Sequence, residues 1–245
     1  MNKTVISLLA ALTLSAALAT VAGQKKDKPW TDWSKKEAEK MLSDSPWAQT
    51  QTDTDTSQMF YSPTADPRTM GTSSNDSSRL AQGATNQSVS VNFHVRFFSS
   101  RPIRQALARL MALQRQPPPD VLEKLKAFAE LKSTNSIIVT VSFDSTDQRY
   151  SGVVMQAFNS AITATMKNDS YLQRADGKQL FLEEYVPPGK DGFGARFIFL
   201  REVNGQPFIA DKSGEIHFSA RYPNGIKVDR RFKIADMIYE GELEY

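Results

Sequence analysis

The sequence predicts an α+β fold, in which an antiparallel β-meander over about residues 170–235 packs against three amphipathic helices. The meander is indicated by short alternating segments that are separated by turn-forming pairs ending in glycine. The pairs Asn204-Gly205 and Asn224-Gly225 are the strongest of these signals. Asn and Gly both tolerate the positive φ of a tight hairpin turn, so each pair favours a hairpin.

The strands of the meander differ in their pattern. The segment Glu215–Tyr222 alternates between apolar and polar side chains, which predicts a strand with one buried face and with His217 on the polar face. The segment Gly194–Val203 is different, because Phe197–Leu200 is apolar on both faces. Such a run is typical of a central strand that is covered on both sides. We therefore expect Phe199 to be fully buried.

Helices are predicted where apolar residues recur at the spacing of one helical face. One helix is expected to begin at Pro102 and a second at Asp120. A third is expected from about Ser151 to Lys167, and its Phe158 and Ile162 would cover the central strand. Additional strands are expected near residues 89–98 and 137–143, because both segments are rich in β-branched and aromatic residues.

Composition divides the chain into four parts. The first resembles a secretory signal peptide, with an early Lys3, an apolar run and small residues before a cleavage site. An uncleaved membrane anchor is the alternative, because the run approaches the roughly 20 residues that span a bilayer. The parts are a signal peptide at residues 1–22, a Trp-rich helical segment at 23–49, a polar flexible segment at 50–87 and an α+β globular domain at 88–245.

The polar segment 50–87 is dominated by Thr, Ser, Asp, Asn and Gln. It holds too few apolar residues to offset the entropy lost on ordering, so we expect a flexible tether or loop. Export to the periplasm or extracellular space is expected from the signal peptide. The chain has no cysteine, which excludes a disulfide-stapled module and thiol chemistry. Its net charge of only +3, with basic and acidic residues interspersed, argues against nucleic acid as a partner.

All three tryptophans, Trp30, Trp33 and Trp47, lie in or beside the N-terminal helical segment, where Ser34 and Glu37 form a capping box. They are the candidate ligand-binding or docking residues of the sequence. A carbohydrate platform and a membrane interface are possible functions for them. Packing of the helix onto the body is favoured, because tryptophan normally anchors packing.

The motifs Trp30-Thr-Asp-Trp33, Glu37-Ala38 and Ser45-Pro46-Trp47-Ala48 resemble the opening of a group of uncharacterised secreted bacterial proteins. The segment Asp191-Gly-Phe-Gly194 and the closing residues 237–245 are similar to the same group. The resemblance covers most of the mature chain. It implies no activity, ligand or site residue.

No catalytic motif is found, and no cofactor or metal is expected. His94 and His217 with Asp229 would suit a metal only if their strands were neighbours, so ordinary solvated histidines are favoured. The sequence therefore favours a non-enzymatic envelope or extracellular module that binds an unknown protein or envelope partner. The alternative is a cell-wall or carbohydrate-active hydrolase that uses loop carboxylates, and the candidates are Asp144, Asp147, Asp191 and Asp211.

Overall fold

Two antiparallel sheets form the body of the protein, and the predicted α+β class is confirmed. The structure is a computed structural model that describes residues 28–55, 89–115, 117–132, 135–145, 148–210 and 214–245. The five-stranded sheet has the order β1-β2-β3-β7-β6, and the four-stranded sheet has the order β11-β10-β4-β5. The first is built from β1 (Ala48–Asp55), β2 (Val89–Phe97), β3 (Ser136–Ser145), β6 (Glu184–Val186) and β7 (Ala195–Leu200). The second is built from β4 (Ser170–Arg174), β5 (Gln179–Phe181), β10 (Glu215–Arg221) and β11 (Lys227–Lys233).

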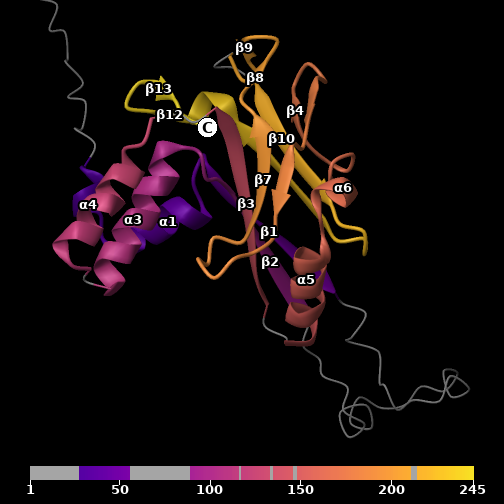
Figure 1. Ribbon diagram of the computed structural model, residues 1–245, viewed down its shortest axis with the longest axis horizontal. Coiled ribbons are helices and arrows are strands. Elements are labelled where there is room, and N and C mark those ends of the chain that lie inside the picture. Colours follow the sequence, from indigo (N-terminus) through magenta and orange to yellow (C-terminus); the bar gives the residue numbers. More distant parts are fainter. Residues whose placement is uncertain (1–27, 56–88, 116, 133–134, 146–147, 211–213) are drawn as a thin grey trace, which may run out of the picture.

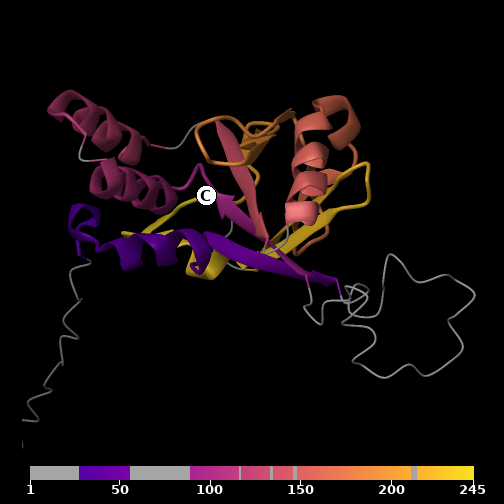
Figure 2. The ribbon, with the colours of Figure 1, turned by 90° about the horizontal axis from the view of Figure 1, so that it is seen from below.

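Helices stand on two sides of the strands (Figure 1). One group contains α1 (Lys35–Ser43), α3 (Arg101–Arg115) and α4 (Pro119–Ala129), and the other contains α5 (Gln148–Ser160) and α6 (Thr163–Met166). Figure 2 shows the α3–α4 pair and α5 well apart from each other, with strands between them. The short elements are η1 (Trp30–Asp32), β8 (Glu202–Val203), β9 (Gln206–Pro207), η4 (Ile234–Asp236), β12 (Ile238–Tyr239) and β13 (Glu242–Leu243).

The core lies between the two sheets and is rich in phenylalanine. Phe97 of the five-stranded sheet meets Phe232 of the other sheet edge-to-face, with 4.9 Å between ring centroids. Phe197 meets Phe218 in the same way at 5.2 Å. Phe199 also contacts Phe218 and is fully buried, as the sequence predicted. Edge-to-face aromatic pairs add to the stabilisation that burial of their area provides.

The position of β7 corrects one part of the predicted meander. β7 leaves the chain of hairpins and pairs with β3 and β6 in the five-stranded sheet. Its second face is not covered as expected, because Leu200 is 50 % exposed and Ile198 is only half-buried. The four-stranded sheet covers the face that carries Phe199. The apolar run Phe197–Leu200 therefore has one deeply buried face, not the two that the sequence predicted.

Side chains of β1 join the two sheets along one edge. The Gln51 amide donates from Nε2 to the carbonyl of Lys227 at 2.8 Å, and its Oε1 accepts from the amide of Asp229 at 2.7 Å. Gln49 donates to the carbonyl of Arg231 at 2.8 Å. These amides take the place of a neighbouring strand, and they satisfy backbone groups that an edge strand otherwise leaves open.

At the opposite edge the chain itself crosses from one sheet to the other. The Leu182 amide, just after β5, donates to the carbonyl of Ser170 at 3.0 Å. The next amide, that of Glu183, donates to the carbonyl of Ile198 in β7 at 2.9 Å. Both edges of the sheet pair are therefore bridged by hydrogen bonds.

Helix α5 closes one end of the core, and Phe158 is its largest fully buried side chain. Phe158 stacks on Tyr222, with 4.6 Å between the ring centroids, and it also contacts Phe143. The Tyr185 hydroxyl donates to the carbonyl of Phe158 at 2.7 Å, and burial raises the pKa of Tyr185 to about 12. The expected contribution of Ile162 is wrong, because this side chain is 56 % exposed.

The predicted third helix ends earlier than expected, which explains the exposure of Ile162. Ile162 has an extended backbone, with φ −130° and ψ 162°, and it separates α5 from α6. The Thr165 hydroxyl accepts from the Ile162 amide and donates to the Ile162 carbonyl. Threonine side chains compete with the helical ladder in this way, so the chain turns and the helical face does not continue.

Two arginine side chains donate hydrogen bonds to carbonyl groups at the C-terminal ends of helices. Arg96 donates from Nε to the carbonyl of Leu42 in α1 at 2.6 Å, and burial lowers the pKa of Arg96 to about 10. Arg104 donates to the carbonyl of Phe128 in α4 at 3.2 Å, and burial lowers its pKa as well. A cation at this end of a helix is favoured by the helix dipole.

Strand β1 corrects the predicted boundary of the polar segment. Residues 50–87 were expected to be flexible, yet β1 continues to Asp55 and pairs with β2 over its whole length. Its polar residues are satisfied by partners on both sides, since the threonines meet β2 side chains and the glutamines meet β11. The rest of that segment and the expected signal peptide at residues 1–22 lie outside the described residues. Within the described part of the chain, no helix combines the length and apolarity that a membrane span requires.

Candidate functional site

The three tryptophans attach the N-terminal segment to the body. Trp33 and Trp47 are only 8 % and 4 % exposed. The Trp47 indole donates to the carbonyl of Glu244 at 2.7 Å, and the half-buried Trp30 donates to the Glu130 carboxylate at 2.7 Å. These rings occupy packing positions, so they leave little surface for a carbohydrate or a membrane.

His94 belongs to a polar chain on the outer face of the five-stranded sheet. Its Nδ1 is 3.0 Å from the Thr50 hydroxyl, and its Nε2 is 2.5 Å from the Asp144 carboxylate. A hydroxyl, an imidazole and a carboxylate in line resemble the parts of a nucleophilic relay. However, the Thr50 hydroxyl donates its proton to the carbonyl of Ser43 at 3.2 Å. The hydroxyl is thus shared between the imidazole and a backbone carbonyl, and the chain is a cross-strand hydrogen-bond network.

Of the candidate carboxylates, the described residues include Asp144, which lies in β3, and Asp191, and a basic side chain engages each of them. Asp191 accepts from the amide of Phe193 at 3.0 Å and forms an ion pair with Arg196. Partial burial raises the pKa of Asp144, but hydrogen bonds from His94 and Asn92 outweigh it, and the net pKa is lowered. A general acid needs a raised pKa, so Asp144 is unsuited to that role. The other two candidates, Asp147 and Asp211, lie outside the described residues.

His217 is not the solvated histidine that the sequence suggested. Its side chain is only 13 % exposed, and its Nε2 is 2.6 Å from the Asp229 carboxylate. Lys227 contacts the same carboxylate at 2.9 Å. Partial burial raises the pKa of Asp229, but hydrogen bonds from Lys227 and His217 lower it by more, and the net pKa falls. Asp229 is therefore an anion held by two basic groups.

The outer face of the four-stranded sheet carries the most distinctive surface of the described residues. Two rows of side chains cross its strands side by side. The first row is Phe181, Tyr171, Ser219 and Asp229, and the second is Gln179, Gln173, His217 and Arg231. We call these eight residues the β4–β11 face. Residues on one face of adjacent strands lie close enough to act on the same ligand.

Aromatic rings run through this face. Phe181 is 46 % exposed, and its ring centroid is 6.1 Å from that of Tyr171. Tyr171 is in turn 6.2 Å from the His217 ring. The planes of the paired rings lie at 65° and 86° to each other, so both pairs pack edge to face. The buried side chains of the same strands, such as Phe218, point to the opposite face.

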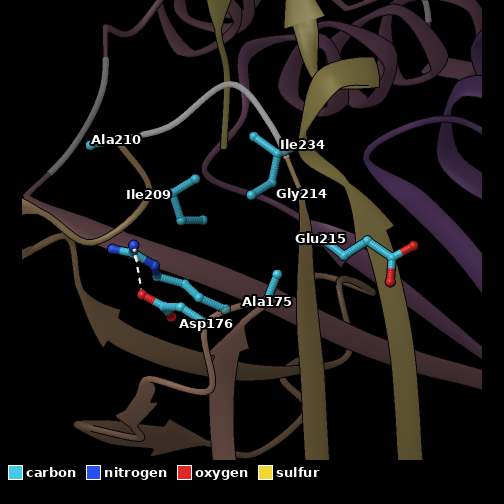
Figure 3. A pocket seen from close by; sticks show the side chains of 8 residues that line it. Ala175, Asp176, Ile209, Ala210, Gly214, Glu215 and Ile234 are labelled. Atoms are coloured by element: carbon cyan, nitrogen blue, oxygen red, sulfur yellow. Dashed lines mark hydrogen bonds and ion pairs between the residues drawn. The ribbon is translucent and has the colours of Figure 1, made fainter.

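A pocket of about 490 Å³ opens at one end of the same sheet (Figure 3). Ile209 and Ile234 line it, and Glu215 extends away from them. Arg174 contributes no free charge, because it donates to the Asp176 carboxylate at 2.9 Å and to the carbonyl of Phe208 at 3.1 Å. The pocket therefore offers an apolar wall with few directed polar groups, and it is a weaker candidate than the β4–β11 face.

Metal binding and similarity to known proteins give no further assignment. No group of three or more histidine and carboxylate side chains that could hold a metal ion occurs among the described residues, and His94 and His217 lie on different sheets. Comparison with known proteins gave no match among protein families, characterised sequences or solved structures.

The sequence analysis identified single residues of the β4–β11 face but did not predict the surface that they form together. It placed His217 on the polar side of its strand and considered Asp229 only as a third group of a metal site with both histidines. It missed Tyr171 and Phe181, because their proximity follows from the register of β4 with β5. The one usable signal was the Asp176-Gly177 pair, which predicts that hairpin.

Proposed function

We propose that the protein is exported and acts in the periplasm or extracellular space as a non-enzymatic binding module. Its binding surface is the β4–β11 face. The observation that carries this proposal is the aromatic row formed by the exposed Phe181 and the half-buried Tyr171, beside His217. Exposed aromatic side chains on a rigid sheet are frequent anchors of binding sites, because they bury a large area at little entropic cost.

The rigidity of the sheet supports the proposal. The β4–β11 face rests on the core residues Leu172, Phe218 and Phe232, each fully buried. Gln51 also fixes the outer edge of β11 to the other sheet. A surface held in this way loses little entropy when a ligand binds.

A hydrolase is the less well supported hypothesis. Asp144 and Asp191 are each engaged by a basic side chain, His94 and Arg196 respectively. Their charges are therefore compensated within the protein, whereas catalytic carboxylates must meet the substrate.

Sedimentation with isolated cell envelopes tests the binding surface. Replacement of Tyr171 and Phe181 by Ala is expected to weaken binding by about tenfold or more, which corresponds to the loss of roughly 1.4 kcal/mol. The matched control replaces Leu113 and Leu131 of the helical side, which are 39 % and 49 % exposed, by Ala. Equal binding of the Tyr171/Phe181 variant and the wild type would refute the proposed surface.

Mass spectrometry of the mature protein tests export separately. An N-terminus between about Thr20 and Lys25 is expected, because small residues precede this point as they do at signal-peptide cleavage sites. Recovery of a chain that begins at Met1 from the membrane fraction would contradict export by cleavage.

A further inference from the structure

Strand β11 gives the β4–β11 face a cationic margin. Along β11, Lys227, Asp229, Arg231 and Lys233 alternate with side chains that point inward. Lys227, Arg231 and Lys233 are exposed, and only Asp229 among the four is acidic. The basic side chains thus form a line at one side of the aromatic row.

The charges of this margin are available to a ligand. The Asp229 carboxylate is already held by Lys227 at 2.9 Å and His217 at 2.6 Å. Arg231 has a side chain that is 66 % exposed, and its contact with Glu215 is long, at 3.9 Å. Lys233 has no carboxylate within 4.0 Å among the described residues. Arg231 and Lys233 therefore remain free to bind an anion.

The distance between the cationic margin and the aromatic end suits an extended ligand. Adjacent strands lie about 4.8 Å apart, so β11 is roughly 10 Å from β4 and roughly 14 Å from β5. Gln173 lies on β4, between the strand that carries Phe181 and the strand that carries the cations, and Gln179 lies beside Phe181 on β5. Both supply amide donors and acceptors. A ligand that fits has an apolar ring face at one end, hydroxyl groups along its length and an acidic group at the other.

We propose that the β4–β11 face binds an anionic polysaccharide. Sugar rings pack against Tyr171 and Phe181, and the acidic groups of the chain meet Arg231 and Lys233. This inference rests on the proposed function and adds the chemical class of the ligand. Charge complementarity supports it, since Lys227 is paired with Asp229 and the nearby Glu215 contacts Arg231 only at 3.9 Å, which leaves the charges of Arg231 and Lys233 largely uncompensated.

Other partners fit the same face less well. Insertion into a membrane needs several large exposed apolar side chains, and Phe181 is the one such side chain in the β4–β11 face. Addition of an extended peptide needs a free strand edge, but Gln49 and Gln51 already occupy the edge of β11. A polysaccharide needs neither of these features.

Calorimetric titration with polygalacturonate, and with its methyl ester as the neutral counterpart, tests the ligand class. The wild type is expected to bind polygalacturonate at least about tenfold more tightly than the ester, and this binding should weaken as salt screens the charges. The variant Arg231→Gln/Lys233→Gln should lose about tenfold in affinity. The control Lys124→Gln/Lys132→Gln removes the same charge from exposed positions on the helical side and should bind as the wild type does.

Several results would overturn the inference. These are equal binding of the ester, equal loss in the Lys124/Lys132 control, tighter binding of vesicles that contain phosphatidylglycerol, and equally tight binding of a single-stranded oligonucleotide. Thermal melts of each variant distinguish loss of binding from loss of folding. If polygalacturonate shows no binding while Tyr171 and Phe181 are still required for sedimentation with envelopes, the proposed ligand class is wrong, and the proposed binding surface is retained.

Discussion

Truncation of Phe199 tests how the two sheets form the core. The side chain has no exposed surface, pairs across the sheet with the buried Ile137, and contacts Phe218 with 6.4 Å between ring centroids. Phe199→Ala removes a whole ring from between two sheets that are bridged at both edges and cannot collapse freely. Loss of burial and the remaining cavity together cost roughly 3–5 kcal/mol in proteins. This is a large fraction of the roughly 5–15 kcal/mol that typically stabilises a domain.

The neighbouring residue provides the control. Leu200 points to the other face of the same strand and is 50 % exposed, so Leu200→Ala is expected to change the free energy of unfolding by no more than about 0.5 kcal/mol. Denaturant unfolding followed by circular dichroism measures both variants. A loss below about 1 kcal/mol for Phe199→Ala, or an equal loss for Leu200→Ala, would refute the two-sheet core.

Three further predictions concern the edge, the acid response and one turn. Gln51→Ala leaves two backbone groups of β11 unpaired and should lower the free energy of unfolding, measured with denaturant, by about 1–3 kcal/mol. Replacement of the exposed Gln179 by Ala should be nearly neutral, and equal losses would contradict a role of Gln51 in joining the two sheets. The pKa of Asp229 is lowered from its ordinary value of 3.8, so the ionised carboxylate contributes stability above pH 3.8 that is lost as the pH falls below this value. Asp229→Asn should therefore flatten the dependence of stability on pH below pH 3.8, and an unchanged slope would contradict this. Gly194 and Gly225 both have positive φ, but only at Gly194 would a Cβ collide with the backbone of β3, so Gly194→Ala should lower the melting temperature more than Gly225→Ala, and equal shifts would exclude the collision as the cause.

Local patterns predicted the elements whose structure depends on neighbours in the sequence. The alternating segments near residues 89–98 and 215–222 became β2 and β10, because one face of each meets the core. The Asn204-Gly205 pair forms the expected hairpin turn, with φ of 54° and 72°. The Asn224-Gly225 pair also joins two strands, but only Gly225 has positive φ, because the loop spans more residues than a two-residue turn.

The features that sequence patterns did not predict depend on contacts between segments that are distant in the sequence. The polar strand β1 looked flexible because its stability comes from hydrogen bonds to β2 and β11, which are distant in the sequence. In the same way, β7 lies within the predicted meander in sequence but pairs with β3 and β6 in space. Composition and periodicity report what a segment can bury, and they do not report which partner covers it.

Local sequence patterns could not predict the candidate site either, because it also depends on long-range contacts. The tryptophans attracted attention as large aromatic residues, yet Trp33 and Trp47 are buried. The exposed rings belong to Phe181 and Tyr171, which become neighbours only through the pairing of β4 with β5. Strand register therefore had to be known before a surface could be assigned.

Hydroxyl-radical footprinting of the wild-type protein, free and bound to isolated cell envelopes, tests the binding surface most directly. Tyr171 and Phe181 are partly or largely exposed, so both should be oxidised in the free protein. If the β4–β11 face is the binding surface, both rings become protected in the bound protein, while the exposed Leu113 and Leu131 of the helical side react as before. Protection of Leu113 and Leu131 with no change at Tyr171 and Phe181 would contradict the account.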